Sequence, residues 1–219
     1  MNIFKKGLEL IQEHPDKPHG KWINGQYVTT SKNTPAHKAM AEVDADLKKQ
    51  DAIYNKLIAL DEKIQNGLEI NEAIQEYEKI LTADNLRIIN AQKHVLALPN
   101  LYIINNQNDK AWAFYNFLYM HSTVDKGKIR GLQAKMLKKD KKHRDAIEFY
   151  MLKYMEDFTW KHSFDRAAFI KDIGVSVRAL KWTDANQTTI ADIMEKYVSS
   201  YNHRAMIDEY RAFIQSIEG

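Results

Sequence analysis

Helix-breaking residues are rare in this chain, and their placement constrains its fold more than any other feature. The 219 residues include only 8 glycines and 4 prolines. The prolines are Pro15, Pro18, Pro35 and Pro99. Because proline and glycine interrupt helices, the long spans between them favour helices. Hydrophobic residues make up 44% of the chain, enough for a packed core. We therefore expect an all-α fold, apart from one small hairpin.

That hairpin is predicted in residues 20–30, within an N-terminal arm that we assign to residues 1–34. Asn24 and Gly25 suit a two-residue type I′ turn, and apolar residues flank them on both sides. Residues 1–14 precede it and are typical of a short amphipathic helix. Their apolar run is broken by Lys5, Lys6 and Glu9, which excludes a signal peptide.

Residues 35–99 are predicted to form a long antiparallel αα-hairpin. Thr34 and Pro35 make a good helix start, and Asn66-Gly67 a good helix end. A second helix is expected from Asn71 to Pro99, which gives two helices of about thirty residues with a coiled-coil-like seam. Asp84 falls on this seam and indicates a local break or a solvated end. The seam residues are Met40, Val43, Leu47, Tyr54, Leu57, Leu60, Ile64, Ile74, Tyr77, Leu81, Ile88, Ala91, Val95 and Leu98.

Residues 100–219 are predicted to form a compact helical bundle, either alone or as one domain with residues 35–99. Residues 101–107 favour a strand or an extended linker. Ile147, Met151, Tyr154 and Phe158 follow helical spacing, and we expect their helix to be the hub of this region. The last two helices should pack against it.

Positive charge is concentrated in one short segment, residues 126–144. The whole chain has a formal net charge of +3, whereas this segment holds nine Lys or Arg and one acid, Asp140. Such a segment predicts binding to phosphates or to an acidic protein surface. The nine cations are Lys126, Lys128, Arg130, Lys135, Lys138, Lys139, Lys141, Lys142 and Arg144.

Residues 164–182 carry a second hint of nucleic-acid binding. Gly174 can take the conformation of a tight corner between two helices, and Ser176 can cap the second helix. The sequence Ile-Gly-Val-Ser resembles the turn of many helix-turn-helix DNA-binding proteins. That resemblance implies that Arg178 and Lys181 face the major groove and that Ser176 contacts a phosphate. An ordinary αα corner uses the same residue types.

Arg87 and His94 are the one candidate pair for catalysis. Seven residues apart on one helix, they would share a face. The pair resembles the arginine and histidine of the HEPN ribonucleases, which are helical and usually dimeric. The resemblance implies that the histidine assists proton transfer and the arginine steadies a phosphate. Ile88 departs from the pattern, because a polar residue commonly follows the arginine.

Other classes of site lack support in the sequence. The chain has no cysteine. The eight histidines form no metal-binding motif, and glycine-rich phosphate loops are absent. No apolar run approaches the length that spans a bilayer. We therefore expect no metal, no cofactor, no membrane partner and a cytoplasmic location.

The sequence thus predicts a non-enzymatic helical binding protein. The leading hypothesis is that residues 126–144 contact nucleic acid, with DNA favoured, together with the helix-turn-helix-like segment. The alternative is a protein–protein interaction factor (an adaptor, inhibitor or scaffold) that uses helical and aromatic surfaces and can form homo-oligomers. A HEPN-like ribonuclease is the second alternative.

Overall fold

The computed structural model describes residues 20–23, 26–29, 35–89 and 92–218. These ranges are mostly helical, as the composition predicts. The predicted helix at 1–14 and the Asn24-Gly25 turn lie outside them. Within the described ranges, no helix combines the length and apolar composition that a membrane span requires. The chain divides into two compact units, residues 1–89 and residues 90–219, and each is described by itself.

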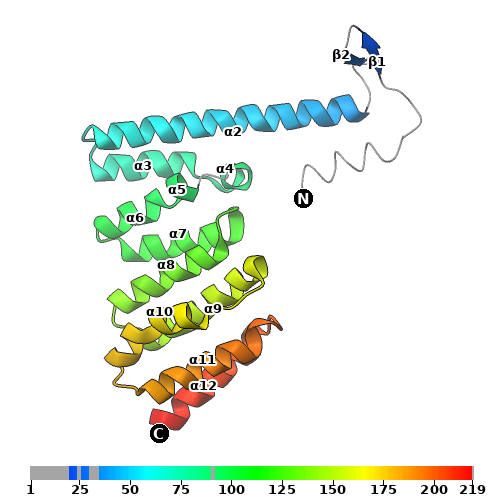
Figure 1. The fold of residues 1–219 in the computed structure, drawn as a ribbon. Coiled ribbons are helices and arrows are strands. Elements are labelled where there is room, and N and C mark those ends of the chain that lie inside the picture. Colours follow the sequence, from blue (N-terminus) through cyan, green and yellow to red (C-terminus); the bar gives the residue numbers. More distant parts are fainter. Residues whose placement is uncertain (1–19, 24–25, 30–34, 90–91, 219) are drawn as a thin grey trace. The chain divides into compact units, whose positions relative to one another are not determined.

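The first unit holds the two strands and three helices that the structure describes before residue 90 (Figure 1). Strand β1 (Gly20–Ile23) pairs antiparallel with β2 (Gln26–Thr29). The helices are α2 (Pro35–Gln65), α3 (Ile70–Ile80) and α4 (Ala83–Ile88). Helix α2 contacts both α3 and α4.

Helices α2 and α3 form an antiparallel hairpin, as predicted. The turn follows Asn66, where Gly67 has a φ of 96°, a left-handed conformation that suits glycine. The Tyr77 hydroxyl of α3 donates a hydrogen bond to Asp61 Oδ1 of α2 at 2.5 Å. Burial of the Tyr77 side chain, together with Asp61, raises the pKa of its hydroxyl well above the usual range. This bond fixes the register of the two helices.

The second helix of the hairpin is much shorter than predicted. Instead of one helix from Asn71 to Pro99, α3 ends at Ile80 and three short helices follow. The break has a local cause. Thr82 Oγ1 accepts a hydrogen bond from the Asn85 backbone N–H at 3.4 Å, and Asn85 Nδ2 donates to the Ile80 carbonyl at 2.7 Å. These side chains satisfy backbone groups that a continuous helix would pair with one another.

The second unit begins with α5 (Gln92–Val95) and α6 (Ala97–Ile104). The strand or linker predicted at 101–107 is therefore wrong for its first four residues, which are helical. Pro99 does not stop α6 because it lies in the first turn, where a missing backbone N–H leaves no hydrogen bond unmade. The division after Ile89 also lies ten residues before the boundary expected from the sequence.

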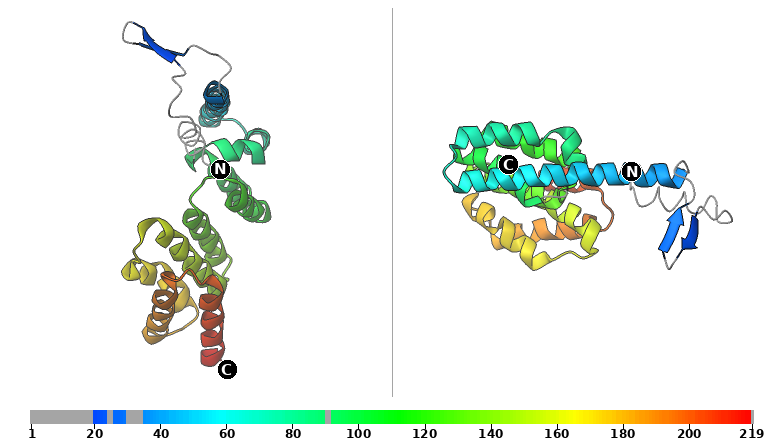
Figure 2. Two further views of the ribbon diagram at one scale, coloured as in Figure 1. Left: turned by 90° about the vertical axis from the view of Figure 1, so that its right-hand side faces the viewer. Right: turned by 90° about the horizontal axis from the view of Figure 1, so that it is seen from above.

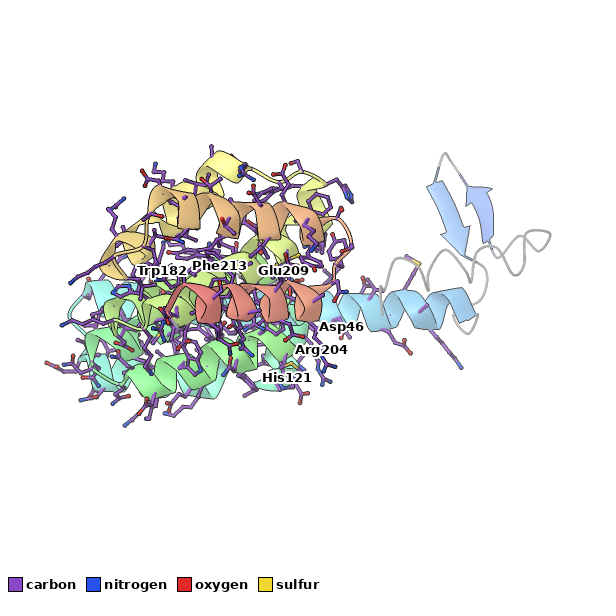
Figure 3. The ribbon with its side chains drawn as sticks, turned by 90° about the horizontal axis from the view of Figure 1, so that it is seen from below. Asp46, His121, Trp182, Arg204, Glu209 and Phe213 are labelled. Carbon is purple, nitrogen blue, oxygen red and sulfur yellow. The ribbon has the colours of Figure 1, made fainter. Side chains whose placement is uncertain are left out.

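Six longer helices complete this unit, and α9 is its hub, as predicted. They are α7 (Asn108–His121), α8 (Lys126–Lys139), α9 (His143–Lys161), α10 (Arg166–Ala179), α11 (Asp184–Val198) and α12 (His203–Glu218). Helix α9 contacts α8, α10, α11 and α12, and its residues Ile147, Met151 and Tyr154 lie in the buried core. Polar contacts add to this packing. Glu209 of α12, labelled in Figure 3, accepts hydrogen bonds from Lys196 Nζ and the Tyr197 hydroxyl of α11, each at 2.6 Å.

Helices α8 and α10 are built alike after a shift of forty residues, a relation that the sequence analysis did not find. Each has 14 residues. Asp125 and Asp165 cap their N-termini through hydrogen bonds of 3.0 and 2.9 Å. Lys141 and Lys181 close their C-termini with φ angles of 61° and 58°. The next N–H bonds back across the turn in both, from Lys142 to Leu137 and from Trp182 to Val177.

Lys181→Gly is expected to stabilise the protein by about 1 kcal/mol, because glycine adopts a left-handed conformation without steric cost. The matched change Lys171→Gly, inside α10, is expected to destabilise by about the same amount. Urea unfolding of both variants checks the pair. A loss of stability in Lys181→Gly as large as that in Lys171→Gly would contradict the assigned turn.

Candidate nucleic-acid interface

Helix α8 packs closely on α9 because small residues lie between them. Gly127, Gly131 and Ala134 are all buried. A Cβ atom at position 127 would lie 2.0 Å from Asp157 Oδ1, and one at position 131 would lie 3.1 Å from Lys153 Cδ. The glycines thus leave room for the Asp157 and Lys153 side chains of α9 and do not form a turn. Since this face of α8 is buried against α9, Lys128, Lys135 and Lys139 project from another side of the helix.

Three lysines form a straight row on the exposed face of α8. Lys128, Lys135 and Lys139 are spaced by seven and four residues, so their side chains project in nearly the same direction. All three are exposed, and none of them forms a salt bridge with another described residue. At 1.5 Å per residue the row is about 16 Å long. We call these three residues the lysine stripe.

Arg130, in contrast, packs within the protein against two aromatic rings. Its guanidinium carbon lies 4.1 Å from the ring centre of Tyr119 and 5.3 Å from that of Phe149. Its Nη1 donates a hydrogen bond to Gln133 Oε1 at 3.1 Å. The Tyr119 hydroxyl donates a hydrogen bond to Glu156. The pKa of Tyr119 is raised, mainly by burial of the side chain and secondly by this hydrogen bond. Arg130 is therefore held in a cation–π stack and cannot reach a phosphate without leaving it.

Arg144 is also occupied, because its Nη2 lies 2.5 Å from Glu218 Oε2 of α12. Lys126 and Lys138 have aromatic partners as well. The Lys126 ammonium lies 4.9 Å from the ring centre of Tyr119, and that of Lys138 lies 5.8 Å from the ring centre of Tyr150. Lys126 is exposed and Lys138 half-buried, and at helical spacing neither of them points in the direction of the stripe.

The stripe ends in a region of mixed charge. Lys141 and Lys142 are exposed in the turn between α8 and α9. Lys142, however, lines a cavity of about 460 Å³ that also holds Asp109, Asp140, Asp145 and Glu148. Nearby carboxylates lower the attraction of this end for a polyanion. The lysine stripe is therefore the part of this segment that best suits a contact with phosphates.

The helix-turn-helix prediction for residues 164–182 is wrong. Helix α10 continues through Gly174 to Ala179. Gly174 is buried, and a Cβ atom there would lie 3.2 Å from Gln187 Nε2, which donates a hydrogen bond of 2.6 Å to the Ile170 carbonyl. The glycine makes room for α11 and does not form a corner.

The proposed phosphate ligand of that segment is wrong too. Ser176 is 0% exposed, and its hydroxyl has no hydrogen-bond partner among the described residues. It therefore cannot reach a nucleic acid. Arg178 and Lys181 are exposed, but Lys181 lies in the turn after α10 rather than on a recognition helix.

The geometry assumed for Arg87 and His94 does not exist. Arg87 lies in α4 and His94 in α5, and the chain leaves the helix at Ile89. The two residues also fall in different compact units. The argument that one helical face would present both side chains is lost. Among the described residues, no group of three or more His, Asp or Glu is placed to hold a metal ion.

The sequence identified the lysines of the stripe but missed the aromatic partners of Arg130. Tyr119 and Phe149 come from α7 and α9, and no local pattern connects them. The forty-residue shift between α8 and α10 did leave a signal, in Asp125 with Asp165 and Lys141 with Lys181. Searches of protein-family models, of curated proteins and of solved structures found no match to this chain.

Proposed function

We propose that the protein is a non-enzymatic binding protein that contacts the phosphate backbone of duplex DNA through the lysine stripe. The observation that carries this proposal is the row formed by Lys128, Lys135 and Lys139, which are exposed and free of salt bridges with other described residues. A straight, rigid row of about 16 Å suits a duplex, which presents a phosphate about every 3.4 Å along each strand. Phosphate contacts of this kind carry no sequence preference.

Comparison with α10 supports a role of the lysines in binding. The positions of α10 that correspond to the stripe hold Ala168, Val175 and Ala179. Helix α10 has the same length, cap and turn without any charge at these positions. The fold therefore does not require lysine at these positions, and their charge is available for binding.

Binding is expected to weaken steeply with salt. Three phosphate contacts give a slope of log affinity against log salt of about −2.7, so affinity should fall about 40-fold between roughly 50 and 200 mM salt. Fluorescence anisotropy of a labelled duplex measures this, with single-stranded RNA of equal length as a second arm. The proposal is abandoned if the duplex does not bind at the lower salt. Tighter binding of the RNA would replace DNA by RNA as the partner.

A second candidate function, interaction with another protein, is favoured by one observation in the first unit. Met40 and Leu47 of α2 are exposed to 65% and 51%. Large apolar side chains that recur on one face of a helix are typical of a partner-binding surface. This surface is separate from the lysine stripe, and both can serve one protein.

A further inference from the structure

The apolar seam of α2 is longer than the part of it that is buried. The seam residues of α2 recur at spacings of three, four and seven residues, as in a coiled-coil heptad. They include Met40, Val43, Leu47, Tyr54 and Leu57. Leu57 is fully buried within the unit. Of the side chains described from residue 38 onward, the first buried one is Ile53. The N-terminal half of the seam is thus largely exposed.

The lengths of the helices explain this exposure. Helix α2 has 31 residues and α3 has 11, which correspond to about 46 and 16 Å. Helix α4 adds 6 residues. The N-terminal half of α2 extends past both of them (Figures 1 and 2). A heptad pattern that continues beyond α3 and α4, the helices described beside it in this unit, predicts a further partner.

The charges beside the exposed seam indicate the chemistry of that partner. Asp44 and Asp51 occupy the positions next to the seam on one side, and Asp46 occupies the position on the other side; Figure 3 labels Asp46. Lys48 and Lys49 lie on the outer face of the helix, away from the seam. Flanking residues set partner choice in helical pairs, so this surface favours a partner with basic flanks.

We propose that residues 38–51 of α2 dock an amphipathic helix of another protein, whose apolar stripe is flanked by lysine or arginine. This inference rests on the second candidate function and specifies its partner class. A second copy of this chain fits poorly. Asp46 would face Asp51 in a parallel pair, and Asp44 and Asp51 would face one another in an antiparallel pair.

Two designed peptides of three heptads test the proposal. Both carry leucine along the seam, one with lysine and the other with glutamate at every flanking position. Fluorescence anisotropy with the full chain should show that the lysine peptide binds and that the glutamate peptide binds at least about tenfold more weakly. Leu47→Ser should weaken binding of the lysine peptide about tenfold or more, because the apolar contact that Leu47 would make with the peptide is lost. Ala45→Ser, on the outer face of the same helix, is the matched control and should leave binding unchanged.

Each other outcome overturns the proposal in a distinct way. Equal binding of the two peptides would rule out a preference for basic flanks, although α2 would still bind a helix. Failure of both peptides to bind would rule out docking on this surface. Sedimentation that shows a dimer abolished by Leu47→Ser would make a second copy the occupant. The DNA-binding proposal is tested by a separate measurement with duplex DNA. A negative result with the peptides therefore counts against docking on α2 and not against DNA binding by the lysine stripe.

Discussion

The triple variant Lys128→Glu, Lys135→Glu and Lys139→Glu is expected to lose affinity for duplex DNA by about 100-fold or more at low salt. The variant loses three phosphate contacts, and each new carboxylate repels the backbone. The salt slope should fall toward zero, since no counterions are released on binding. Because all three side chains are exposed, the helical circular dichroism signal and the unfolding midpoint should change little.

One control separates the stripe from the net charge. The variant Lys48→Glu, Lys49→Glu and Lys56→Glu makes the same change in charge at exposed positions of α2 and should keep most of the DNA affinity. An equal loss in this control would mean that the overall charge governs binding, which contradicts a local site.

A gain-of-function variant gives the opposite arm. Placing lysine at Val175 and Ala179, which are exposed, copies the last two lysines of the stripe onto α10, which has the same cap and turn. Ala168 is left unchanged, because it packs against the core. The two added lysines should raise the DNA affinity and steepen the salt slope by up to about −1.8. An unchanged slope would show that exposed lysines in this row are not sufficient for phosphate contact.

Phe169→Ala is expected to lower the free energy of unfolding of residues 90–219 by about 3–5 kcal/mol. Phe169 is fully buried. Its ring lies 5.2 Å from that of Tyr154 and 5.7 Å from that of Phe164. The substitution leaves a cavity where α9 and α10 meet and removes both aromatic contacts.

Urea denaturation followed by circular dichroism measures this loss. Val175→Ala on the same helix is the control, because Val175 is exposed, and it should change stability by less than about 1 kcal/mol. A loss in Phe169→Ala as small as in this control would contradict the core position of Phe169.

The sequence predicted those parts of the fold that local signals determine. Gly67 ends the first hairpin helix, and the stripe of Ile147 and Met151 marks the hub helix. Asp84 on the seam indicated a local break or a solvated end, but the heptad pattern continues past Ile80, so the three short helices that follow were not predicted. Thr82 and Asn85 interrupt the helix through side-chain hydrogen bonds to the backbone, which hydrophobic spacing does not reveal.

The candidate site was predicted in part for a similar reason. A count of cations finds Lys128 and Arg130 alike, yet one is free and the other stacks between aromatic rings of two further helices. Ser176 and Gly174 suited a turn by residue type, but packing against α11 and burial place them inside a helix. Side-chain roles that depend on distant neighbours cannot be obtained from spacing alone.

The likeness of α8 and α10 means that recognition and stability are carried by different residues in this fold. The caps, the buried face and the closing turn set the frame and recur in both helices. The exposed positions differ, with Lys135 and Lys139 in one helix and Val175 and Ala179 in the other. Mutation at these outer positions can therefore alter what the surface attracts while leaving the frame intact, and the same scaffold is open to acquiring new partners.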